Sequence, residues 1–325
     1  MIRFRYFTFL RFFNVIKISL SYLLSYLFKK SIYFGKPYAV SIEISSICNL
    51  ACHQCLVGRK EIKRRTDLMK LEDFKHILNK LPKEVFYINL YFQGEPLLNP
   101  DIFEMIRLAK AKNCYTLIST NGTLLDTHYC AKLIGSGLDK LIISLDGSNQ
   151  RIYSKYRSGG NIQQVLIGVE TLQKMKRMVP SRFPKLEIQA IVLKTNEDDL
   201  PNIRQIALNH HVESLVLKSA QIYDLKNNTH LLPQNPYYSR YKMDAQGEYV
   251  LKNRNTSTCG KLWFGNVITC DGDFLPCCYD KNAENSFGNI LESTYNQLIY
   301  GSRAKVFRKK VCKNRKDILI CNHCI

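Results

Sequence analysis

The sequence predicts an α/β fold in which a partial (β/α)6 barrel is followed by a small C-terminal α+β domain. Short β-rich runs alternate with helical patterns from residue 38 onward, and this alternation is typical of βαβ units and a parallel sheet. The chain has 325 residues, 46% of them hydrophobic, which is enough to bury a full core and an appended unit. Cysteines gather at both ends of the alternating region.

The predicted elements follow one another in barrel order. Buried strands are expected over residues 39–44, 85–92, 115–120, 140–144, 186–193 and 214–218. Helices are expected between them, over residues 71–81, 100–112, 127–136, 162–178 and 199–210. These strands are too few for a full eight-stranded barrel, so an open or partial barrel fits better.

Composition divides the chain into four segments. Residues 1–37 form a basic amphipathic segment, residues 38–222 the α/β core, residues 223–256 a loop-rich linker, and residues 257–325 the C-terminal domain. In the last segment, the Asp271-Gly272 turn lies between two short strand-like runs, and a helical pattern covers residues 294–310.

The N-terminal segment reads as an amphipathic helix. Arg11, Asn14 and Lys17 interrupt its apolar run, so a clean membrane-spanning stretch is absent, and no small-residue cleavage site indicates a secretory signal. Arg11, Asn14, Ser21 and Ser25 share one side at helical spacing, opposite a wide apolar face. Such a helix packs on its own protein or lies in a membrane interface.

Charge narrows the classes of partner. Lysine and arginine outnumber the acids 47 to 27, with the excess concentrated at the two ends of the chain. A solvated basic surface, an anionic membrane surface and a phosphorylated substrate all agree with this balance. No recognition motif and no aromatic-basic interleaving is present, so no nucleic-acid partner is expected.

The twelve cysteines are clustered. A secreted disulfide scaffold would be shorter and would space its cysteines along the whole chain. Clustered thiols on both sides of a cysteine-poor α/β region indicate metal sites in a reducing compartment, and therefore a cytoplasmic protein. Cys114 and Cys130, between the clusters, are expected to be small apolar core residues.

The first cluster consists of Cys48, Cys52 and Cys55, directly after the first predicted strand. Loops at the carboxyl ends of barrel strands hold the chemistry of such folds. Three thiolates can wrap one face of a [4Fe–4S] cube and leave one iron without a protein ligand. Zinc is the alternative, with His53 as a fourth ligand.

This Cys-x3-Cys-x2-Cys loop resembles the signature of the radical S-adenosylmethionine (SAM) superfamily. The resemblance implies that the open iron binds the amino and carboxylate groups of SAM. Reductive cleavage then gives a 5′-deoxyadenosyl radical that takes a hydrogen atom from the substrate. It also implies an electron donor such as flavodoxin or ferredoxin. Gln54 stands where the family usually has an aromatic residue.

Other positions resemble the family's SAM contacts, in the family's order. Gly94-Glu95-Pro96 follows the second strand and resembles the motif that receives the SAM ammonium, where the glycine lets backbone approach and the carboxylate meets positive charge. Polar residues after the third and fourth strands stand where relatives contact the ribose and the methionine carboxylate; they are Ser119, Asn121, Ser144 and Asp146. Arg157 is a further candidate partner for a carboxylate.

The tail resembles the start of the SPASM pattern, with Cys259, then Gly272 five residues before Cys277, then Cys321-Asn-His-Cys324. A shortened form, the twitch domain, holds a single auxiliary cluster and occurs in an enzyme that oxidises an aminocyclitol alcohol. The resemblance implies a second [4Fe–4S] cluster with four ligands, Cys259, Cys277, Cys321 and Cys324. Cys270, Cys278 and Cys312 are then spare, and a zinc ribbon remains the alternative.

Four thiolates saturate a cluster, which favours electron transfer or structural support over substrate binding. Three functions follow. The leading one is an oxidoreductase that abstracts hydrogen from a sugar, aminocyclitol or related metabolite. The second is modification of a peptide or protein, and the third is a zinc- or cluster-stabilised binding protein that never cleaves SAM. The sequence identifies no general base.

Overall fold

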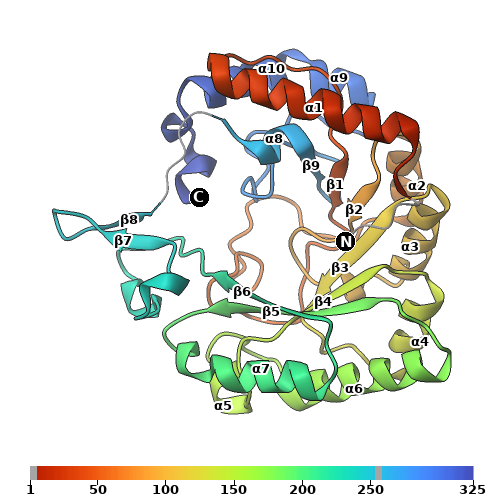
Figure 1. The fold of residues 1–325 in the computed structure, drawn as a ribbon, viewed down its shortest axis with the longest axis vertical. Helices are drawn as coiled ribbons and strands as arrows, with labels where there is room; N and C mark the ends of the chain where they lie inside the picture. The colour runs from red at the N-terminus through yellow and green to blue at the C-terminus, as the bar shows by residue number, and fades with distance from the viewer. Residues whose placement is uncertain (1–5, 253–257, 325) are drawn as a thin grey trace. The chain divides into compact units, whose positions relative to one another are not determined.

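The computed structural model describes residues 6–252 and 258–324. Arg3, Arg5, the end of the expected linker and the last residue lie outside the described residues. The chain forms two compact units. Unit 1 contains residues up to Ile47, Ile62–Thr116 and Asn255–Cys324, and unit 2 contains Cys48–Glu61 and Leu117–Arg254. Figure 1 labels the elements of both.

Unit 1 is built on a sheet with the strand order β10-β9-β1-β2. Its strands are β1 (Ala39–Ile42), β2 (Tyr87–Asn89), β9 (Gly265–Ile268) and β10 (Phe274–Leu275). β1 pairs in parallel with β2 and β9, while β9 and β10 are antiparallel. The turn between them requires Gly272, because its φ is +92° and a Cβ there would lie 2.6 Å from Oδ1 of Asn289.

Helices cover the sheet of unit 1 (Figure 1). They are α1 (Phe9–Phe28), α2 (Leu71–Lys80), α3 (Ile102–Ala111), α8 (Gly260–Phe264), α9 (Tyr295–Tyr300) and α10 (Ser302–Lys313). Phe74 of α2, Ile42 of β1 and Trp263 of α8 are completely buried. This apolar core holds the strands of unit 1 in place, and the polar loops of the unit begin at the ends of these strands.

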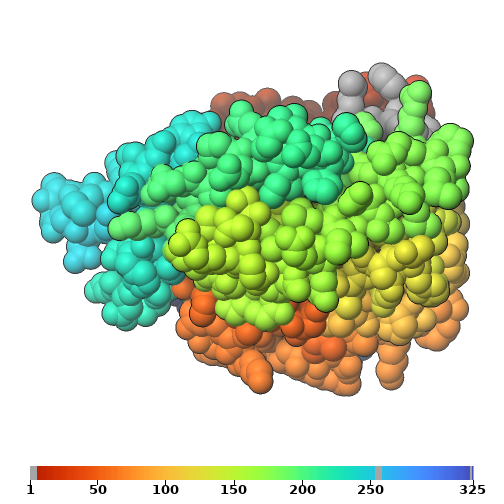
Figure 2. Space-filling model, turned by 90° about the horizontal axis from the view of Figure 1, so that it is seen from below, coloured from red at the N-terminus to blue at the C-terminus, as the bar shows by residue number. Residues whose placement is uncertain are grey.

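Unit 2 carries the parallel order β3-β4-β5-β6. Its strands are β3 (Tyr115–Thr120), β4 (Lys140–Ser144), β5 (Lys185–Val192) and β6 (Ser214–Ser219), and its helices are α4 (Thr127–Gly135), α5 (Gln150–Tyr153), α6 (Ile162–Met178) and α7 (Leu200–Asn209). Figure 1 shows α5, α6 and α7 on one side of β4 and β5, and Figure 2 shows this helical surface from below.

The fold class predicted from the sequence is confirmed, since the sheets are dominated by parallel pairing. Two segments have more local structure than the sequence pattern indicated. The stretch expected as a linker contains an antiparallel hairpin, β7 (Tyr241–Met243) and β8 (Tyr249–Leu251), which projects from unit 2. The tail helix divides at Gly301, whose extended backbone ends α9 and caps α10.

The domain limits predicted from the sequence also differ from the compact units. β9 belongs to the segment expected as a separate C-terminal domain, yet it forms a parallel ladder with β1. Strand pairing of this kind joins distant segments into one hydrogen-bonded sheet, so the tail belongs to unit 1. No helix among the described residues is long and apolar enough to cross a membrane.

Candidate functional site

The first cysteine cluster lies in unit 2, in the loop that spans residues 48–61. Within this loop, the N–H of Cys55 donates to the carbonyl of Cys52 at 3.1 Å, and the N–H of Arg59 donates to the carbonyl of Cys55 at 2.9 Å. Cys52 belongs to a buried apolar cluster with Leu50 and Tyr156, and Cys48 and Cys55 pack against it. The loop is therefore a folded turn that brings its thiols onto one apolar base.

Gly58 was missed by the sequence reasoning, although the turn depends on it. A Cβ at Gly58 would lie 2.5 Å from the backbone nitrogen of Cys52. No real side chain tolerates that separation, so the glycine allows the chain to close behind the cysteines. The signal in the sequence is its place three residues after the last cysteine of the cluster.

Two polar side chains approach the sulfur atoms. Nδ2 of Asn121 lies 3.9 Å from Sγ of Cys48, and a guanidinium nitrogen of Arg157 lies 3.8 Å from Sγ of Cys52. Burial raises the pKa of the Cys52 thiol, and Arg157 opposes that shift by stabilising the thiolate. Both contacts suit sulfur atoms that carry negative charge, because hydrogen bonds to charged acceptors are the strong ones.

Asp146, predicted to contact SAM, is bonded within the protein in this structure, and its contact with the cofactor stays a prediction. Its carboxylate is buried, accepting a hydrogen bond from the N–H of Ile191 at 2.6 Å and another from Nε of Arg157 at 2.5 Å. Both oxygens are thus bonded within the protein. Asp146 positions Arg157, whose side chain is only 13% exposed, against the cysteine loop.

Asn121 also fastens the cysteine loop through Asn49, a residue that the sequence reasoning passed over. Nδ2 of Asn121 donates to Oδ1 of Asn49 at 2.8 Å, and Nδ2 of Asn49 donates to Oγ1 of Thr123 at 2.9 Å. Oδ1 of Asn121 accepts from the N–H of Thr123 at 2.9 Å. The segment after β3 therefore holds the cysteine loop by side-chain amides.

Ser144 shares a sheet face with a polar residue that was not anticipated. Ser144 pairs with Gln189 of β5, and Ser119 of β3 pairs with Ile142, which lies two residues before Ser144. Paired and alternate residues of parallel strands point to the same side. Ser119, Ser144 and Gln189 are all half-buried on this face, so they form one polar strip.

The motif after β2 lies in unit 1, and the close approach at Gly94 is to the protein's own backbone. Gly94 has a φ of +65°, and a Cβ there would lie 2.5 Å from the carbonyl oxygen of Ser45. The next N–H, that of Glu95, donates to the carbonyl of Ile47 at 2.8 Å. Oε1 of Glu95 accepts from the N–H of Leu97, and Pro96 begins a short 3-10 turn. The motif thus braces the strand end that precedes the first cysteine.

Gln54 carries an observation that bears on cofactor binding. Its side chain is buried, and Oε1 has no hydrogen-bond partner among the described residues. A buried polar atom without a partner is costly, so a bound polar group that supplies a donor would relieve it. Three thiols on one turn, two polar neighbours at the sulfurs and this acceptor fit a cluster with a polar cofactor beside it.

The tail cysteines predicted as ligands all lie in unit 1. Burial raises the pKa of Cys277 well above its ordinary value, and the nearby thiols of Cys259 and Cys321 add to that rise. Burial raises the pKa of Cys321 to about 11, with further contributions from Cys259 and Cys324. These shifts agree with thiols that lie near one another, and the role of these cysteines as cluster ligands stays a prediction. Cys278 is exposed on the surface, which favours Cys277 as the inward thiol of the vicinal pair.

Two cations flank this group. Burial alone would lower the pKa of Arg315, but the thiols of Cys259, Cys324 and Cys321 raise it above its ordinary value. Arg315 also donates to the carbonyl of Thr258 at 3.1 Å. Lys261 lies over the ring of Tyr279, 4.6 Å from its centroid, and its pKa is likewise raised by Cys278 and Tyr279 against the effect of burial.

The spare cysteines lie apart from both groups or at their edge. Cys114, Cys130, Cys270 and Cys312 are all buried. Burial raises the pKa of Cys130 to about 12 and that of Cys270 to about 11. Cys270 contacts Oγ of Ser46 at 3.3 Å. Within the described part of the chain, no three cysteine, histidine, aspartate or glutamate residues form a group that could hold a single metal ion.

Comparison with known proteins identifies the class that this fold and these thiols define. Residues 42–204 match the radical SAM superfamily, and residues 259–325 match SPASM, an iron–sulfur cluster-binding domain. The chain belongs to the radical SAM superfamily. This membership implies SAM and a [4Fe–4S] cluster, and the SPASM domain implies auxiliary iron–sulfur binding.

The proteins that this chain resembles include a maturase and two proteins whose structures hold different bound molecules. The chain is 29% identical over 292 residues to the mycofactocin maturase MftC of Mycolicibacterium smegmatis, covering 84% of this chain and 72% of that protein. Its fold is similar to BtrN in complex with AdoMet and 2-DOIA (TM-score 0.54, 18% identity, 89% of this chain and 93% of that chain). It is also similar to Streptococcus suis SuiB bound to precursor peptide SuiA (TM-score 0.62, 16% identity, 83% and 66%).

Several of the curated proteins match this chain over only part of their own length. The chain spans about half the length of several of the curated proteins that it matches. The similarity to the two solved structures is below a fifth in sequence identity, so it concerns the fold.

Arg315 offers a test of the tail site. Replacing it with glutamine removes a positive charge from beside the thiols, which destabilises the reduced, more negative state of an auxiliary cluster. The reduction potential should fall by about 50–100 mV, the size that Coulomb's law gives for one nearby charge at the effective dielectric constant of protein sites. Redox titration followed by electron paramagnetic resonance measures it.

Arg315→Lys is the matched control, because it keeps the charge while losing the planar fork. It should restore most of the potential. An unchanged potential in Arg315→Gln, with iron content intact, would show that this arginine does not lie against the cluster.

Proposed function

We propose that this chain is a radical SAM oxidoreductase that removes two hydrogens from a hydroxyl-bearing small molecule such as a sugar or aminocyclitol. Cys48, Cys52 and Cys55 would hold the SAM-binding cluster, and Cys259, Cys277, Cys321 and Cys324 would hold the auxiliary cluster. When bound, the first cluster with SAM supplies a 5′-deoxyadenosyl radical that abstracts hydrogen, and the second supplies a one-electron acceptor. An external donor such as flavodoxin or ferredoxin provides the initiating electron.

A cavity in unit 1 is the observation that carries this proposal. It has a volume of about 290 Å3 and lies between β1, β2 and β9, with Cys277 and Cys278 at its wall. Polar groups from three elements line it, namely Ser41, Asn89 and Lys261. A hydroxyl-bearing ring held there would lie beside the auxiliary thiols, which shortens the path for an electron leaving the substrate.

The lining residues suit hydroxyl recognition. Nδ2 of Asn89 donates to Oγ of Ser41 at 2.9 Å, which orients the serine hydroxyl and leaves it able to donate in turn. Lys261 lines the same cavity, and its side-chain nitrogen can donate a hydrogen bond to a substrate oxygen.

In unit 2, the chain's own residues prepare the first site. Arg157, held by Asp146, places positive charge at Cys52. Asn121 donates toward Cys48 and ties down the loop. The apolar cluster under the loop buries Cys52 and partly covers Cys48 and Cys55, which strengthens the contact of Arg157 with Cys52.

The first experiment is an anaerobic assay with dithionite and SAM that measures 5′-deoxyadenosine. We expect its formation in reconstituted protein, and faster formation when the correct alcohol is added. Absence of 5′-deoxyadenosine from fully reconstituted protein would instead support a binding protein that never cleaves SAM.

Stoichiometry distinguishes oxidation from rearrangement. A carbon radical that bears a hydroxyl must lose one electron and one proton to become a carbonyl, so an oxidation consumes one SAM for each product. With substrate deuterated at the reacting carbon, deuterium should appear in 5′-deoxyadenosine and stay there. Turnover on substoichiometric SAM, with deuterium returned to product, would contradict net oxidation.

Modification of a peptide is the second candidate, and the sequence relatives favour it. The chain resembles a maturase over most of its length, and its fold resembles an enzyme bound to a precursor peptide. The cavity beside Cys277 would then receive one side chain of the peptide. Stimulation of 5′-deoxyadenosine formation by a peptide, with a matching mass loss of two hydrogens, would decide for this substrate class.

A further inference from the structure

The N-terminal helix α1 is amphipathic in the reverse sense of an ordinary surface helix. Its buried positions are Arg11, Asn14, Ile18, Ser21 and Ser25. All but one of these are polar. A surface helix of a globular protein normally buries its apolar stripe and exposes its polar one. In α1 the buried face is polar, so its apolar face is the exposed one.

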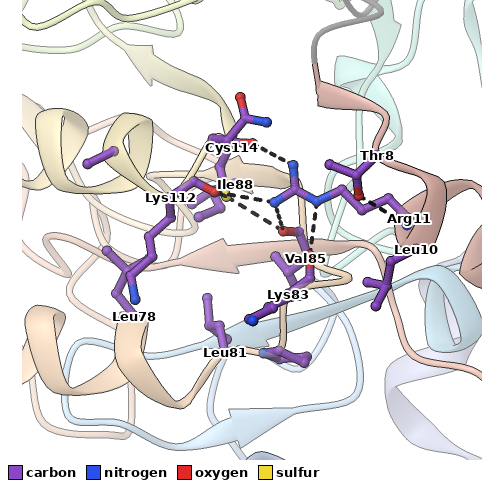
Figure 3. Close-up of a pocket in the computed structure, with 13 residues that line it drawn as sticks. Thr8, Leu10, Arg11, Leu78, Leu81, Lys83, Val85, Ile88, Lys112 and Cys114 are labelled. Atoms are coloured by element: carbon purple, nitrogen blue, oxygen red, sulfur yellow. Dashed lines mark hydrogen bonds between the residues drawn. The ribbon is translucent and has the colours of Figure 1, made fainter.

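Hydrogen bonds hold the polar face of α1 against the rest of unit 1. The guanidinium of Arg11, only 4% exposed, donates to the carbonyls of Val85 and Lys83 at 3.1 and 2.9 Å. Figure 3 shows the guanidinium pointing among these backbone oxygens. Further along, Nδ2 of Asn14 donates to the carbonyl of Lys36 at 2.8 Å, and the N–H of Lys36 donates back to Oδ1 at 2.9 Å.

The second half of α1 is fixed in the same way. Oγ of Ser25 donates to the carbonyl of Ile32 at 2.7 Å and accepts its N–H at 3.0 Å. Oγ of Ser21 accepts from Nε1 of Trp263 at 3.2 Å. Because both halves are bonded along the polar side, the helix cannot roll over and bury its other face without losing these partners.

The outer face is a continuous apolar stripe. Its members recur at intervals of three and four residues, and each exposes a large part of its side chain; they are Phe9, Phe13, Ile16, Leu20, Leu23 and Leu27. Phe9 is 80% exposed and Leu27 60%. A helix of this length extends about 30 Å. The stripe along it is therefore a continuous apolar patch, whereas normal protein surfaces carry their apolar residues singly.

The charges around α1 indicate which kind of partner covers its apolar stripe. Lys17 is exposed on the helix, and Lys29 and Lys30 follow its last turn. The sequence has no acidic residue before Glu43, and the chain carries a net charge of +20. Two copies packed through this face would bring like charges together. An anionic surface would instead be attracted to them.

We propose that α1 is a membrane-interface helix that lays its apolar stripe into the surface of an anionic lipid bilayer. Helices of this kind sink their aromatic and leucine side chains about 5–10 Å into the boundary between headgroups and acyl chains. The polar face that such helices turn to water is here bonded to unit 1. The rest of unit 1 thus replaces water at the polar face of α1, and the bilayer covers the apolar face, which unit 1 leaves exposed.

Vesicle flotation tests this with the full chain. Vesicles of phosphatidylcholine and phosphatidylglycerol should carry the wild-type protein upward, and vesicles of phosphatidylcholine alone should carry much less. The triple variant Phe9→Gln, Leu20→Gln, Leu27→Gln should reduce binding to the anionic vesicles by about tenfold or more. Raising the salt concentration should release the wild-type protein.

A matched control replaces three other apolar residues that are also largely exposed, Ile167→Gln, Met178→Gln and Leu208→Gln, and should bind like wild type. The chain has one tryptophan, and it bonds to α1, so unchanged emission from Trp263 shows that the helix remains docked in each variant. Iron content and 5′-deoxyadenosine formation should also be unchanged, because none of these residues belongs to either cysteine group.

Three outcomes would overturn the proposal. One is equal flotation of wild type and the triple variant. Another is binding to phosphatidylcholine alone that matches binding to anionic vesicles. The third is a wild-type dimer in sedimentation that the triple variant dissociates, without vesicle binding by either protein, which would assign the stripe to a second copy of this chain.

Discussion

Replacing Cys48, Cys52 and Cys55 together with alanine is expected to remove about half of the roughly eight irons of reconstituted protein and to abolish SAM cleavage. The three thiols share one folded turn on the apolar base of unit 2, and no other thiol belongs to that loop. The tail cysteines keep their own partners in unit 1. Iron analysis and an anaerobic 5′-deoxyadenosine assay measure the two effects.

Cys130→Ala is the control in the same unit. Cys130 is buried in α4 and donates to the carbonyl of Gly168, so its loss costs some stability and should leave iron and SAM cleavage in place. Full iron content in the triple alanine variant would refute the assignment of this loop. A loss of all iron would show that the variant fails to fold, and single alanine variants would then be compared.

Replacing Cys321 and Cys324 with alanine is expected to separate the two halves of the reaction. About half of the iron should be lost, 5′-deoxyadenosine should still form, and oxidised product should fall to background. The electron that leaves the substrate would have no acceptor beside the cavity that Cys277 lines. Parallel assays of 5′-deoxyadenosine and product on the same samples measure this uncoupling.

Cys312→Ala is the corresponding control. Cys312 is buried in α10, close to Arg308, and its replacement should leave both products in their normal ratio. If anaerobically purified wild type holds zinc with little iron in the tail, the auxiliary-cluster assignment is wrong. If the double variant still couples the two products, the tail cluster is structural.

The sequence by itself determined the order of elements, and it predicts which thiols hold the two clusters. β4 and α6 begin and end where hydrophobic periodicity predicts, because buried strands and amphipathic helices leave local patterns. The spacing of Cys48, Cys52 and Cys55 is likewise local: three ligands on one turn need no distant partner to be recognised. The same holds for the pair Cys321 and Cys324.

Only the tertiary structure decided which polar residues form hydrogen bonds within the protein and which face of α1 is exposed. Asp146 holds Arg157, a contact that no local pattern shows, because the two residues are eleven positions apart and meet only in the fold. Glu95 caps a turn, and Gly58 matters only because Cys52 folds back on it. The pattern of α1 showed two faces without saying which is buried. The buried one is polar, because backbone carbonyls of unit 1 point at it and satisfy Arg11, and that choice turns the apolar stripe outward.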